Sequence, residues 1–361
     1  MHRFDSEAAV ADFVRRCGAR GQPVHAVGSG TKLLHAPLPP ADAEILALRG
    51  LDRITSHEPG DLVVTVQCGA RLSDLQAQLA AHRQWLPVDP PYAEATIGGI
   101  LATNSSGPRR FGYGTMRDHL IGLRVVDGRG VVTRSGGRVV KNVTGYDLHK
   151  LHIGAFGTLG VVTEANFKVR PLPPVAAALV FQTESFEAAH ALLLEVYGLP
   201  LGPVALEAVD GAAIVGVEGS EAVVERHVRD LRRLGRAFEV RDGEEVWSAM
   251  RDLPRDAVRI RIGARPHDLP ALVPGGLRRR AHAGNGIARV DLAPAPDLPA
   301  RIAEWRARAE ARGGYVVVES APAGLPERDR LPWGVPQNRL AGAIRERWDP
   351  GVVLNRGRMA V

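Results

Sequence analysis

The chain has 361 residues, of which 45% are hydrophobic and 5% aromatic, enough apolar material for two domains with mainly aliphatic cores. Its formal charge is +6, but the basic residues are interspersed with Asp and Glu, which argues against a nucleic-acid-binding protein. We interpret the single run of three arginines, residues 278–280, as a solvated face.

Arginine dominates the basic residues. Only four of the 46 are lysines, so arginine supplies the other 42, a bias typical of high-GC coding (the lysines are Lys32, Lys141, Lys150 and Lys168). The two cysteines, Cys17 and Cys68, are too few for a disulfide scaffold, so we expect a cytoplasmic protein. The N-terminus lacks a signal-peptide pattern, and no run approaches the roughly twenty apolar residues of a spanning helix. Any attachment to the inner membrane would therefore be peripheral and through partners.

The first 88 residues predict a small α+β lobe. A helix capped by Asp5 or Ser6 should extend to Cys17, because apolar residues recur along one of its faces. Strands are expected next, at residues 24–28, 45–48, 53–56 and 62–67. A helix is expected after them, at residues 73–82. The run Asp89-Pro90-Pro91 ends this lobe and begins a second one in an extended conformation.

A glycine-containing turn, GSGT, follows the first expected strand. Successive backbone N–H groups from Gly28 to Thr31 could form an anion-binding nest. The spacing matches neither a Walker A loop nor GxGxxG. A simple turn between a strand and a loop explains this segment equally well when it is taken alone.

Residues 89–171 are the part of the chain richest in glycine set beside β-branched residues. Strand-like runs at 123–127, 131–133 and 159–167 alternate with glycine turns. Glycine adopts positive φ and lets another group approach the backbone closely, so this block favours a large ligand held by main-chain N–H groups. A structural role at strand ends is the alternative for any single Gly-Gly pair.

A different order of predicted elements begins after Leu172-Pro173-Pro174. Strands are expected at 177–182, 204–209, 212–218 and 238–241, with helices at 185–197 and 220–234. This βαββαβ order predicts a ferredoxin-like sheet. Helices at 244–253, 297–312 and 335–348 and strands at 258–262 and 315–319 complete the chain before the tail.

Five motifs carry a resemblance to a known family. They are VGSGTK (27–32), DPPYAEATIGGILATNSSG (89–107), YGTMRDHLIGLRVVDGRG (113–130), GAFGTLGVVTEANFKVRPLP (154–173) and DPGVVLNRGRM (349–359). Together they resemble the FAD-binding flavoproteins of the vanillyl-alcohol oxidase and p-cresol methylhydroxylase (PCMH) superfamily, and most of all the FAD-binding E subunits of bacterial glycolate oxidases. The match covers nearly the whole chain.

The resemblance implies an α+β protein in three parts. Residues 1–172 would form a PCMH-type FAD-binding domain, with lobes of about 1–88 and 89–172. Residues 173–330 would form a ferredoxin-like cap domain, and residues 331–361 a tail that returns to the flavin.

The resemblance also implies which residues contact FAD. They are Val27, Gly28, Ser29, Gly30, Thr31 and Lys32 in the first loop; Pro90, Thr96, Gly98, Gly99, Asn104 and Gly107 in the second; Gly114, Thr115 and Asp118 in the YGTxxD segment; Gly157, Gly160, Val161 and Val162 towards adenine; and Asn355 in the tail. Asp118 is expected to brace its loop, and the family's tail proline is replaced here by Arg356. Since the first loop offers Thr31 and Lys32 and the second has no cysteine, we predict non-covalent FAD.

The segment HAGNGIARVDL (282–292) resembles a motif that helps bind a divalent metal in catalytic 2-hydroxy-acid dehydrogenases of the superfamily. His282 is present, but the later position is interpreted as Ala288, and the segment 316–324 offers only Glu319. One imidazole and one carboxylate make a poor metal site, so we expect no metal and assign no catalytic residue.

The leading hypothesis is an FAD-binding subunit of a glycolate oxidase. It would work with a catalytic FAD subunit, which oxidises the 2-hydroxy acid glycolate to glyoxylate, and with an iron–sulfur subunit that receives electrons through FAD. This chain has no ferredoxin-like cysteine run of its own. Two alternatives remain open. One is a self-sufficient FAD-dependent 2-hydroxy-acid dehydrogenase, in which arginines such as Arg259, Arg261 or Arg289 bind a carboxylate. The other is a non-catalytic scaffold subunit.

Overall fold

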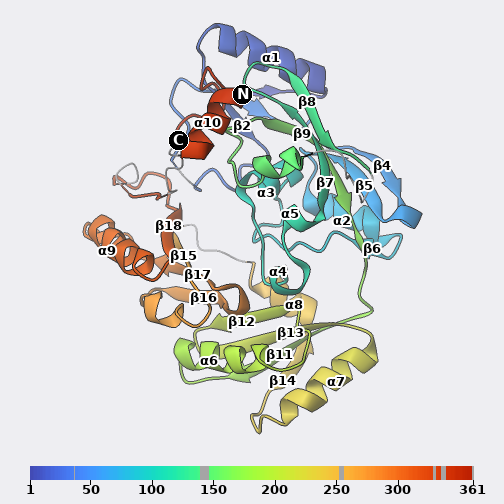
Figure 1. Ribbon diagram of the computed structural model, residues 1–361, viewed down its shortest axis with the longest axis vertical. Coiled ribbons are helices and arrows are strands. Elements are labelled where there is room, and N and C mark those ends of the chain that lie inside the picture. Colours follow the sequence, from blue (N-terminus) through green and yellow to red (C-terminus); the bar gives the residue numbers. More distant parts are fainter. Residues whose placement is uncertain (36, 139–145, 252–255, 328–330, 335–338, 360–361) are drawn as a thin grey trace.

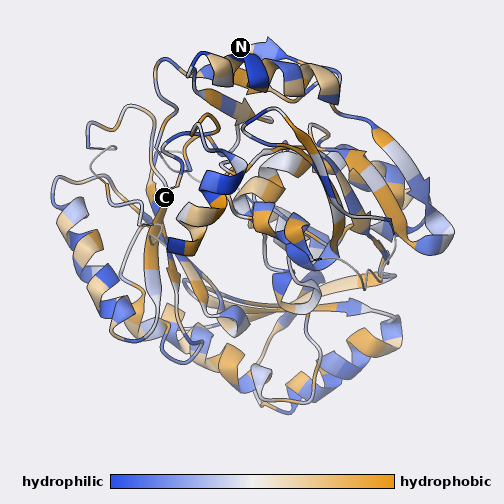
Figure 2. Ribbon diagram, turned by 45° about the horizontal axis from the view of Figure 1, so that its top comes forward, coloured by the Kyte–Doolittle hydropathy of each residue, from blue (hydrophilic) through white to orange (hydrophobic). Residues whose placement is uncertain are grey.

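The computed structural model describes residues 1–35, 37–138, 146–251, 256–327, 331–334 and 339–359. In Figure 1 the N-terminal part of the chain lies at the top and the long sheet of residues 175–320 lies below it. Figure 2 shows apolar residues concentrated along the strands, whereas the outer helices also carry many hydrophilic residues. Among the described helices, none combines the length and the apolar composition needed to cross a bilayer.

The N-terminal segment forms a small three-stranded parallel sheet covered by one helix. Its elements are β1 (His2–Arg3), α1 (Glu7–Ala19), β2 (Val24–Val27) and β3 (Glu44–Ala47), with strand order β1-β3-β2. Ser6 caps α1 by accepting a hydrogen bond from the N–H of Ala9, as the sequence predicts. The buried face of α1 packs in one hydrophobic cluster with Val353 and Leu354, so the C-terminal tail completes this core.

A five-stranded antiparallel sheet follows, in the order β4-β5-β9-β7-β8. Its elements and the segments around it are β4 (Ile54–Glu58), β5 (Val63–Gln67), α2 (Leu72–Ala80), β6 (Gln84–Trp85), α3 (Ile97–Thr103), α4 (Arg110–Tyr113), α5 (Met116–His119), β7 (Leu120–Val126), β8 (Val132–Gly136), β9 (Val161–Lys168) and β10 (Arg170–Pro171). Strand β5 pairs along its length with β9. This sheet therefore joins strands from before residue 88 to strands from well after it.

The eight-stranded sheet, here called the cap sheet, is antiparallel throughout, in the order β14-β11-β13-β12-β16-β17-β15-β18. Its elements are β11 (Val175–Gln182), α6 (Phe186–Tyr197), β12 (Ala205–Val209), β13 (Ala212–Gly219), α7 (Glu221–Arg232), β14 (Glu239–Asp242), α8 (Gly243–Ala249), β15 (Val258–Gly263), β16 (Arg278–His282), β17 (Ile287–Leu292), α9 (Leu298–Glu310) and β18 (Tyr315–Ser320), followed by α10 (Arg339–Trp348).

The cap sheet consists of two similar halves. Strands β11 to β14 have the spatial order fourth-first-third-second, which is that of the predicted ferredoxin-like unit. Strands β15 to β18 repeat the same order, although a short 3₁₀ turn, Pro270–Leu272, replaces the first helix of this half. The halves meet where β12 pairs with β16. The α+β prediction with a ferredoxin-like cap is confirmed, and the second half is an addition that the sequence did not reveal.

The arginine run 278–280 is not the solvated face that we expected. It lies in β16, inside the cap sheet, and its side chains are only partly exposed. Arg279 forms ion pairs with Glu187 and Asp210, while Arg280 turns to the other face and lines a cavity. Alternation along a strand therefore gives neighbouring arginines of one run two different environments.

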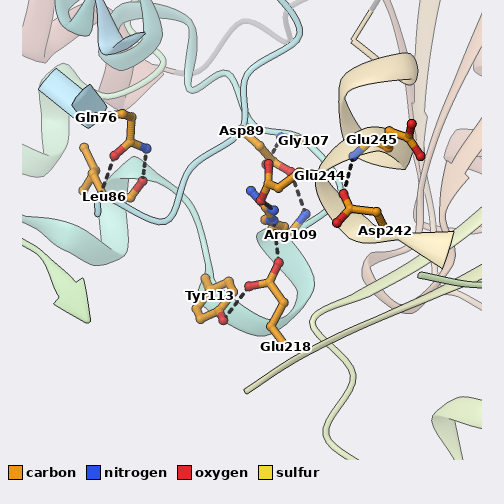
Figure 3. Close-up of polar contacts among 10 residues, drawn as sticks. All are labelled: Gln76, Leu86, Asp89, Gly107, Arg109, Tyr113, Glu218, Asp242, Glu244 and Glu245. Carbon is orange, nitrogen blue, oxygen red and sulfur yellow. Dashed lines mark hydrogen bonds and ion pairs between the residues drawn. The ribbon is translucent and has the colours of Figure 1, made fainter. Parts of the chain in front are cut away.

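A buried polar latch joins the second glycine-rich loop to the cap sheet (Figure 3). The side chain of Arg109 donates to Glu218 on β13 at 2.7 Å and also contacts Glu244 on α8. The hydroxyl of Tyr113 donates to the other oxygen of Glu218 at 2.8 Å. Asp89 accepts hydrogen bonds from the backbone N–H groups of Gly107 and Arg109. This latch fixes the position of the cap sheet over the N-terminal elements.

Candidate functional site

The loop that follows β2 lines a narrow cavity of about 60 Å³, here called the loop cavity. Gly30 has a φ of +77°, which favours glycine at the turn. A Cβ on Gly28 would lie 2.0 Å from the hydroxyl of Thr96, so only glycine lets this loop approach the start of α3. Thr96, Gly99 and Thr103 form the facing wall.

The C-terminal tail closes the loop cavity through Asn355. The side-chain oxygen of Asn355 accepts a hydrogen bond from the N–H of Ala26 at 2.8 Å, and its amide nitrogen donates to the carbonyl of Phe156. The backbone N–H of Asn355 donates to the carbonyl of Val24. Asn355 therefore ties together three segments that are far apart in the sequence, and it lines the loop cavity.

A larger cavity of about 410 Å³, here called the central cavity, lies between the loop and the cap sheet. The two cavities share lining residues, namely Lys32, Thr103, Phe156 and Arg358. The volume lies within the range of small-molecule and cofactor sites. Its walls combine apolar side chains such as Val317 and Met359 with charged side chains of the cap sheet.

A row of polar side chains crosses five strands of the cap sheet beside these cavities. His282 Nδ1 lies 2.5 Å from a carboxylate oxygen of Glu207, across the seam of the two halves. Arg289 Nη1 lies 2.8 Å from His282 Nε2, and Arg289 Nε donates to Glu319 at 2.8 Å. Arg261 lies 3.8 Å from the other oxygen of Glu319.

The arginine determines the tautomer of the histidine. A guanidinium can only donate, so Nε2 of His282 must accept from Arg289, and the ring proton must lie on Nδ1, facing Glu207. Burial and then Arg289 lower the pKa of His282 well below its usual value, so the ring is neutral. Burial raises the pKa of Glu207 well above its usual value.

Glu319 has the opposite electrostatic environment. Burial alone would raise its pKa, but the cations Arg289 and Arg261 outweigh that effect and hold the pKa well below its usual value. Glu319 is therefore a carboxylate, and with Arg289 it forms a fixed ion pair at the edge of the central cavity.

A third cavity, of about 50 Å³, adjoins the central cavity and is here called the small cavity. Its polar lining comes from both sides of the latch and includes Asp89, Ser106, Glu207 and Arg280. By volume it has room for three to five water-sized groups. The small and central cavities have four lining residues in common, namely Lys32, His35, Ser105 and Glu319.

The structure changes the interpretation of the HAGNG segment. The register between β16 and β17 places Ala288 opposite Ala281, on the face of the sheet away from His282. Arg289 is the residue that lies beside His282, and its guanidinium joins the imidazole to Glu319. Within the described ranges, no group of three or more His, Cys, Asp or Glu side chains is arranged to hold a metal ion.

The predicted FAD residues fall into three groups. Those that line the loop cavity are Val27, Gly28, Ser29, Gly30, Thr31, Lys32, Thr96, Gly99 and Asn355. Gly107 lines the small cavity, and Pro90 lines a separate cavity of about 310 Å³ beside Trp85. The remainder line none of these cavities, namely Gly98, Asn104, Gly114, Thr115, Asp118, Gly157, Gly160, Val161 and Val162.

Several of the residues that line none of these cavities have a visible structural role. Asp118 and Thr115 form a capping box at α5, so Asp118 braces its loop as expected. Gly98 donates its N–H to the carbonyl of Cys68, and a Cβ on Gly157 would lie 2.5 Å from Asn355. These residues shape the loops around the cavities.

Sequence reasoning missed several residues that line the central cavity. They are His35, Pro37, Thr103, Ser105, Phe156, Trp333, Gly334, Gly357, Arg358 and Met359. Phe156 has a φ of +52°, and the glycines on both sides of Ala155-Phe156 were the available signal. Arg358 donates to the carbonyls of Lys32, Leu33 and Pro37, which a motif match alone does not indicate.

The described residues fit FAD. Gly28 and Gly30 keep this part of the loop free of side chains, and a Cβ on Gly28 would clash with Thr96, which also lines the loop cavity. The narrow loop cavity offers backbone groups to a diphosphate, and the wider central cavity offers apolar walls to a ring system. FAD has both parts, joined in one molecule.

Comparisons with known proteins agree with this fit. A family model described as an FAD binding domain matches residues 2–136. Glycolate oxidase subunit GlcE of Escherichia coli is 31% identical, and the match covers 99% of each chain. Glycolate oxidase subunit GlcD of Bacillus subtilis is 34% identical over 56% of this chain and 43% of that protein. For D-lactate dehydrogenase of Anaerostipes hadrus the identity is 32%, over 59% of this chain and 45% of that protein.

A solved structure of an alkyldihydroxyacetonephosphate synthase has the same fold. It superposes with a TM-score of 0.72, covering 99% of this chain and 75% of that chain. The sequence identity is only 17%, so this likeness concerns the architecture alone.

Proposed function

The chain belongs to the family of FAD-binding oxidoreductases that includes glycolate oxidase subunit GlcE, and from that premise we propose that it is the FAD-binding subunit of a complex that oxidises glycolate to glyoxylate. The observation that carries the proposal is the end-to-end match with GlcE, over 99% of each chain. The match with GlcD covers less than half of that relative.

In this proposal a catalytic FAD subunit binds glycolate, and this chain passes the electrons to an iron–sulfur subunit. FAD supplies hydride or single-electron transfer when it is bound. The protein would be cytoplasmic and peripheral at the inner membrane through its partners. Residues 1–172 would bind FAD, residues 173–330 would form the cap domain, and residues 331–361 would return to the flavin.

The residues of the chain have separate roles in this function. The loop from Val27 to Lys32 holds the diphosphate through backbone N–H groups, and Asn355 keeps that loop in register with the tail. The cap sheet excludes water from the central cavity. The remaining predicted contacts, among them Val161 and Val162 towards adenine, belong to the same proposal.

The row of polar side chains on the cap sheet supports a division of labour with a catalytic partner. Arg289 occupies the accepting nitrogen of His282 and also pairs with Glu319. The Nε2 atom of His282 is then not free to bind a metal or to take a proton from a substrate hydroxyl. Glu319 is likewise held in its ion pair with Arg289 and is not free to bind a metal. This arrangement supports a chain whose FAD receives its electrons from the catalytic partner.

The test is the visible spectrum of the purified chain, followed by anaerobic addition of glycolate. We expect a flavin spectrum that stays oxidised with the isolated chain and bleaches when the catalytic partner is added. Acid precipitation should release the FAD into the supernatant, because we propose that it is not covalently attached. A chain without flavin that binds none on reconstitution would instead indicate the scaffold role.

One observation favours a second candidate function, that of a self-sufficient 2-hydroxy-acid dehydrogenase. Lys32, Arg261 and Glu319 line the central cavity together, and the two cations could bind a substrate carboxylate. Rapid bleaching of the isolated chain by glycolate or D-lactate would support this function and contradict the electron-transfer role.

A further inference from the structure

Lys32 differs in position from the other two lysines that the structure describes. It lines the loop cavity, the central cavity and the small cavity. Lys150, by contrast, forms an ion pair with Asp147 at 2.7 Å, and Lys168 is exposed at the surface. Lys141 lies outside the described residues. A chain that uses arginine at 42 of its 46 basic positions therefore places one of its few lysines at the junction of three cavities.

Within the described part of the chain, no carboxylate forms an ion pair with the ammonium of Lys32. Among the residues that the structure describes, no acidic oxygen lies within 4.0 Å of its Nζ. Nζ makes a cation–π contact with the ring of Tyr92, whose centroid lies 4.7 Å away. A cation over an aromatic face is stabilised by about 0.5–2 kcal/mol, which is less than the usual cost of burying an unpaired charge.

The charged groups around Lys32 come from every element packed against it. Arg259 and Arg261 on β15 and Arg289 on β17 lower the pKa of Lys32, whereas Glu319 on β18 raises it. Burial is the largest cause, and together these effects lower the pKa to about 7. The other groups nearby are His35, His25 and Asp89, which line the same cavities, and Arg358, which donates to the carbonyl of Lys32.

Among these groups Lys32 takes up a proton first when a negative charge is added nearby, because its pKa of about 7 lies above those of His25 and His35. Burial lowers the pKa of His35 and of His25, so both rings are neutral at pH 7. Asp89 is held by two backbone N–H groups. An arginine in the place of Lys32 would remain charged at every pH, whereas a half-buried lysine with a lowered pKa can lose and regain its proton.

We propose that Lys32 is the redox-linked proton acceptor of this site: its amine takes a proton from water when FAD bound in the adjoining cavities is reduced. The inference rests on the proposed binding of FAD in the loop and central cavities. Two electrons pass from the reductant to FAD, and one N–H bond forms at Nζ of Lys32. No bond between Lys32 and the flavin forms or breaks.

The physical reason is charge compensation. Electrons that enter a cavity of low dielectric raise the proton affinity of the nearest titratable base. Protonated Lys32 then stabilises the reduced state, since charge near the ring system tunes its electronics. Electron uptake by this chain would thus be linked to the uptake of one proton by Lys32. This linkage would hold at pH values between about 7 and the higher pKa that Lys32 acquires when FAD is reduced.

The first test measures the titration of Lys32 directly. Reductive ¹³C-methylation of the FAD-loaded chain labels four lysines and the N-terminal amine, so each signal can be followed by NMR. The signal missing from Lys32→Arg identifies Lys32. We expect it to titrate near pH 7 in the oxidised protein, well below an ordinary lysine, and to shift to the protonated position when dithionite is added. Titration of Lys32 together with the exposed lysines would overturn the proposal.

The second test measures the midpoint potential of FAD as a function of pH. One extra proton for two electrons changes the reduction equilibrium tenfold per pH unit, which is about 30 mV. We expect this extra slope above pH 7 in the wild-type chain and its loss in both Lys32→Arg and Lys32→Met. The arginine variant should keep the higher potential, because it retains the charge. The matched control Lys168→Met removes an exposed lysine and should behave as wild type.

The outcomes separate the two proposals. A chain that binds no FAD contradicts both the proposed function and the role of Lys32. A chain that binds FAD, but whose potential has the same pH slope in wild type and in Lys32→Arg, contradicts only the role of Lys32.

Discussion

Replacement of Glu218 by alanine should destabilise the protein strongly, because Glu218 is the buried acceptor of two side chains. The side chain of Glu218 is fully buried, and that of Arg109, 2.7 Å away, is 4% exposed. Both oxygens of Glu218 accept hydrogen bonds, one from Arg109 and the other from Tyr113 (Figure 3). The alanine variant leaves a buried guanidinium without its main partner.

The magnitude follows from the desolvation of that guanidinium. Removal of one partner of a buried ion pair costs about 3–5 kcal/mol. Glu244 still contacts Arg109, but its side chain is 60% exposed and compensates only weakly. We therefore expect the lower end of the range, about 3 kcal/mol, which makes the unfolding equilibrium about 150-fold less favourable to the folded state.

Equilibrium unfolding in urea measures this loss. Trp85 lies with its ring 5.0 Å from the guanidinium of Arg109, so tryptophan fluorescence reports on the latch itself. The matched control is Asp297→Ala, which breaks the exposed pair with Arg301 and should cost less than about 1 kcal/mol.

A double variant, Arg109→Met with Glu218→Met, tests the reasoning further. It removes both charges while it keeps apolar volume, so it should be much less destabilised than Glu218→Ala. If Glu218→Ala unfolds within about 1 kcal/mol of wild type, or if the double variant loses more stability than the single one, the latch is not a desolvated ion pair and the argument fails.

Three further predictions concern the cavities and the buried histidines. Gly28→Ala should weaken FAD binding by about tenfold or more, measured by flavin fluorescence, because its Cβ would lie 2.0 Å from a neighbouring hydroxyl. Arg289→Met should raise the pKa of His282, measured by NMR, because the adjacent cation helps to lower it. Burial lowers the pKa of His25 and of His152 to about 4. Their contribution to stability is therefore fully present above pH 6.5 and is lost as the pH falls towards 4, by about 1.4 kcal/mol per pH unit for each ring, measured by urea unfolding.

Each of these predictions has a matched control. Gly60→Ala adds a methyl group where no atom lies within 4 Å, so FAD affinity should not change. Arg312→Met removes an exposed arginine and should leave the histidine titration as it is. In His152→Gln, the stability lost per pH unit between pH 6.5 and pH 4 should be smaller by the contribution of one ring, about 1.4 kcal/mol. Equal FAD affinity in Gly28→Ala, an unchanged pKa in Arg289→Met, or stability that rises between pH 6 and pH 4 would contradict the respective prediction.

The local structure could be predicted because its signals are local. Ser6 and Ser185 cap the helices that the sequence predicts there, since a side-chain oxygen needs only the N–H groups two or three residues later. Alternating apolar residues indicated most strands of the cap sheet. The order βαββαβ then favoured the observed strand order of its first half, because short connections leave few other arrangements.

The sequence also determined the loop that fits the cofactor. Residue types from Gly28 to Lys32 left a ligand-binding loop and a simple turn equally open, and only the later motifs of the chain favoured the ligand-binding loop. The short helix α3, with Gly98 and Gly99 in its first turn, was not predicted, because two adjacent glycines have low intrinsic helix propensity. The hydrogen bond from Gly98 N–H to Cys68 and the burial of Ile97 stabilise it in the folded chain.

Only the tertiary structure determined the polar row beside the cavities. Glu207 and His282 are 75 residues apart and meet because two similar halves pair through β12 and β16. Arg289, and not Ala288, faces His282, because side chains alternate across a strand and the pairing register selects the face. A sequence specifies that alternation, but which face meets a cavity depends on partners that come from distant parts of the chain.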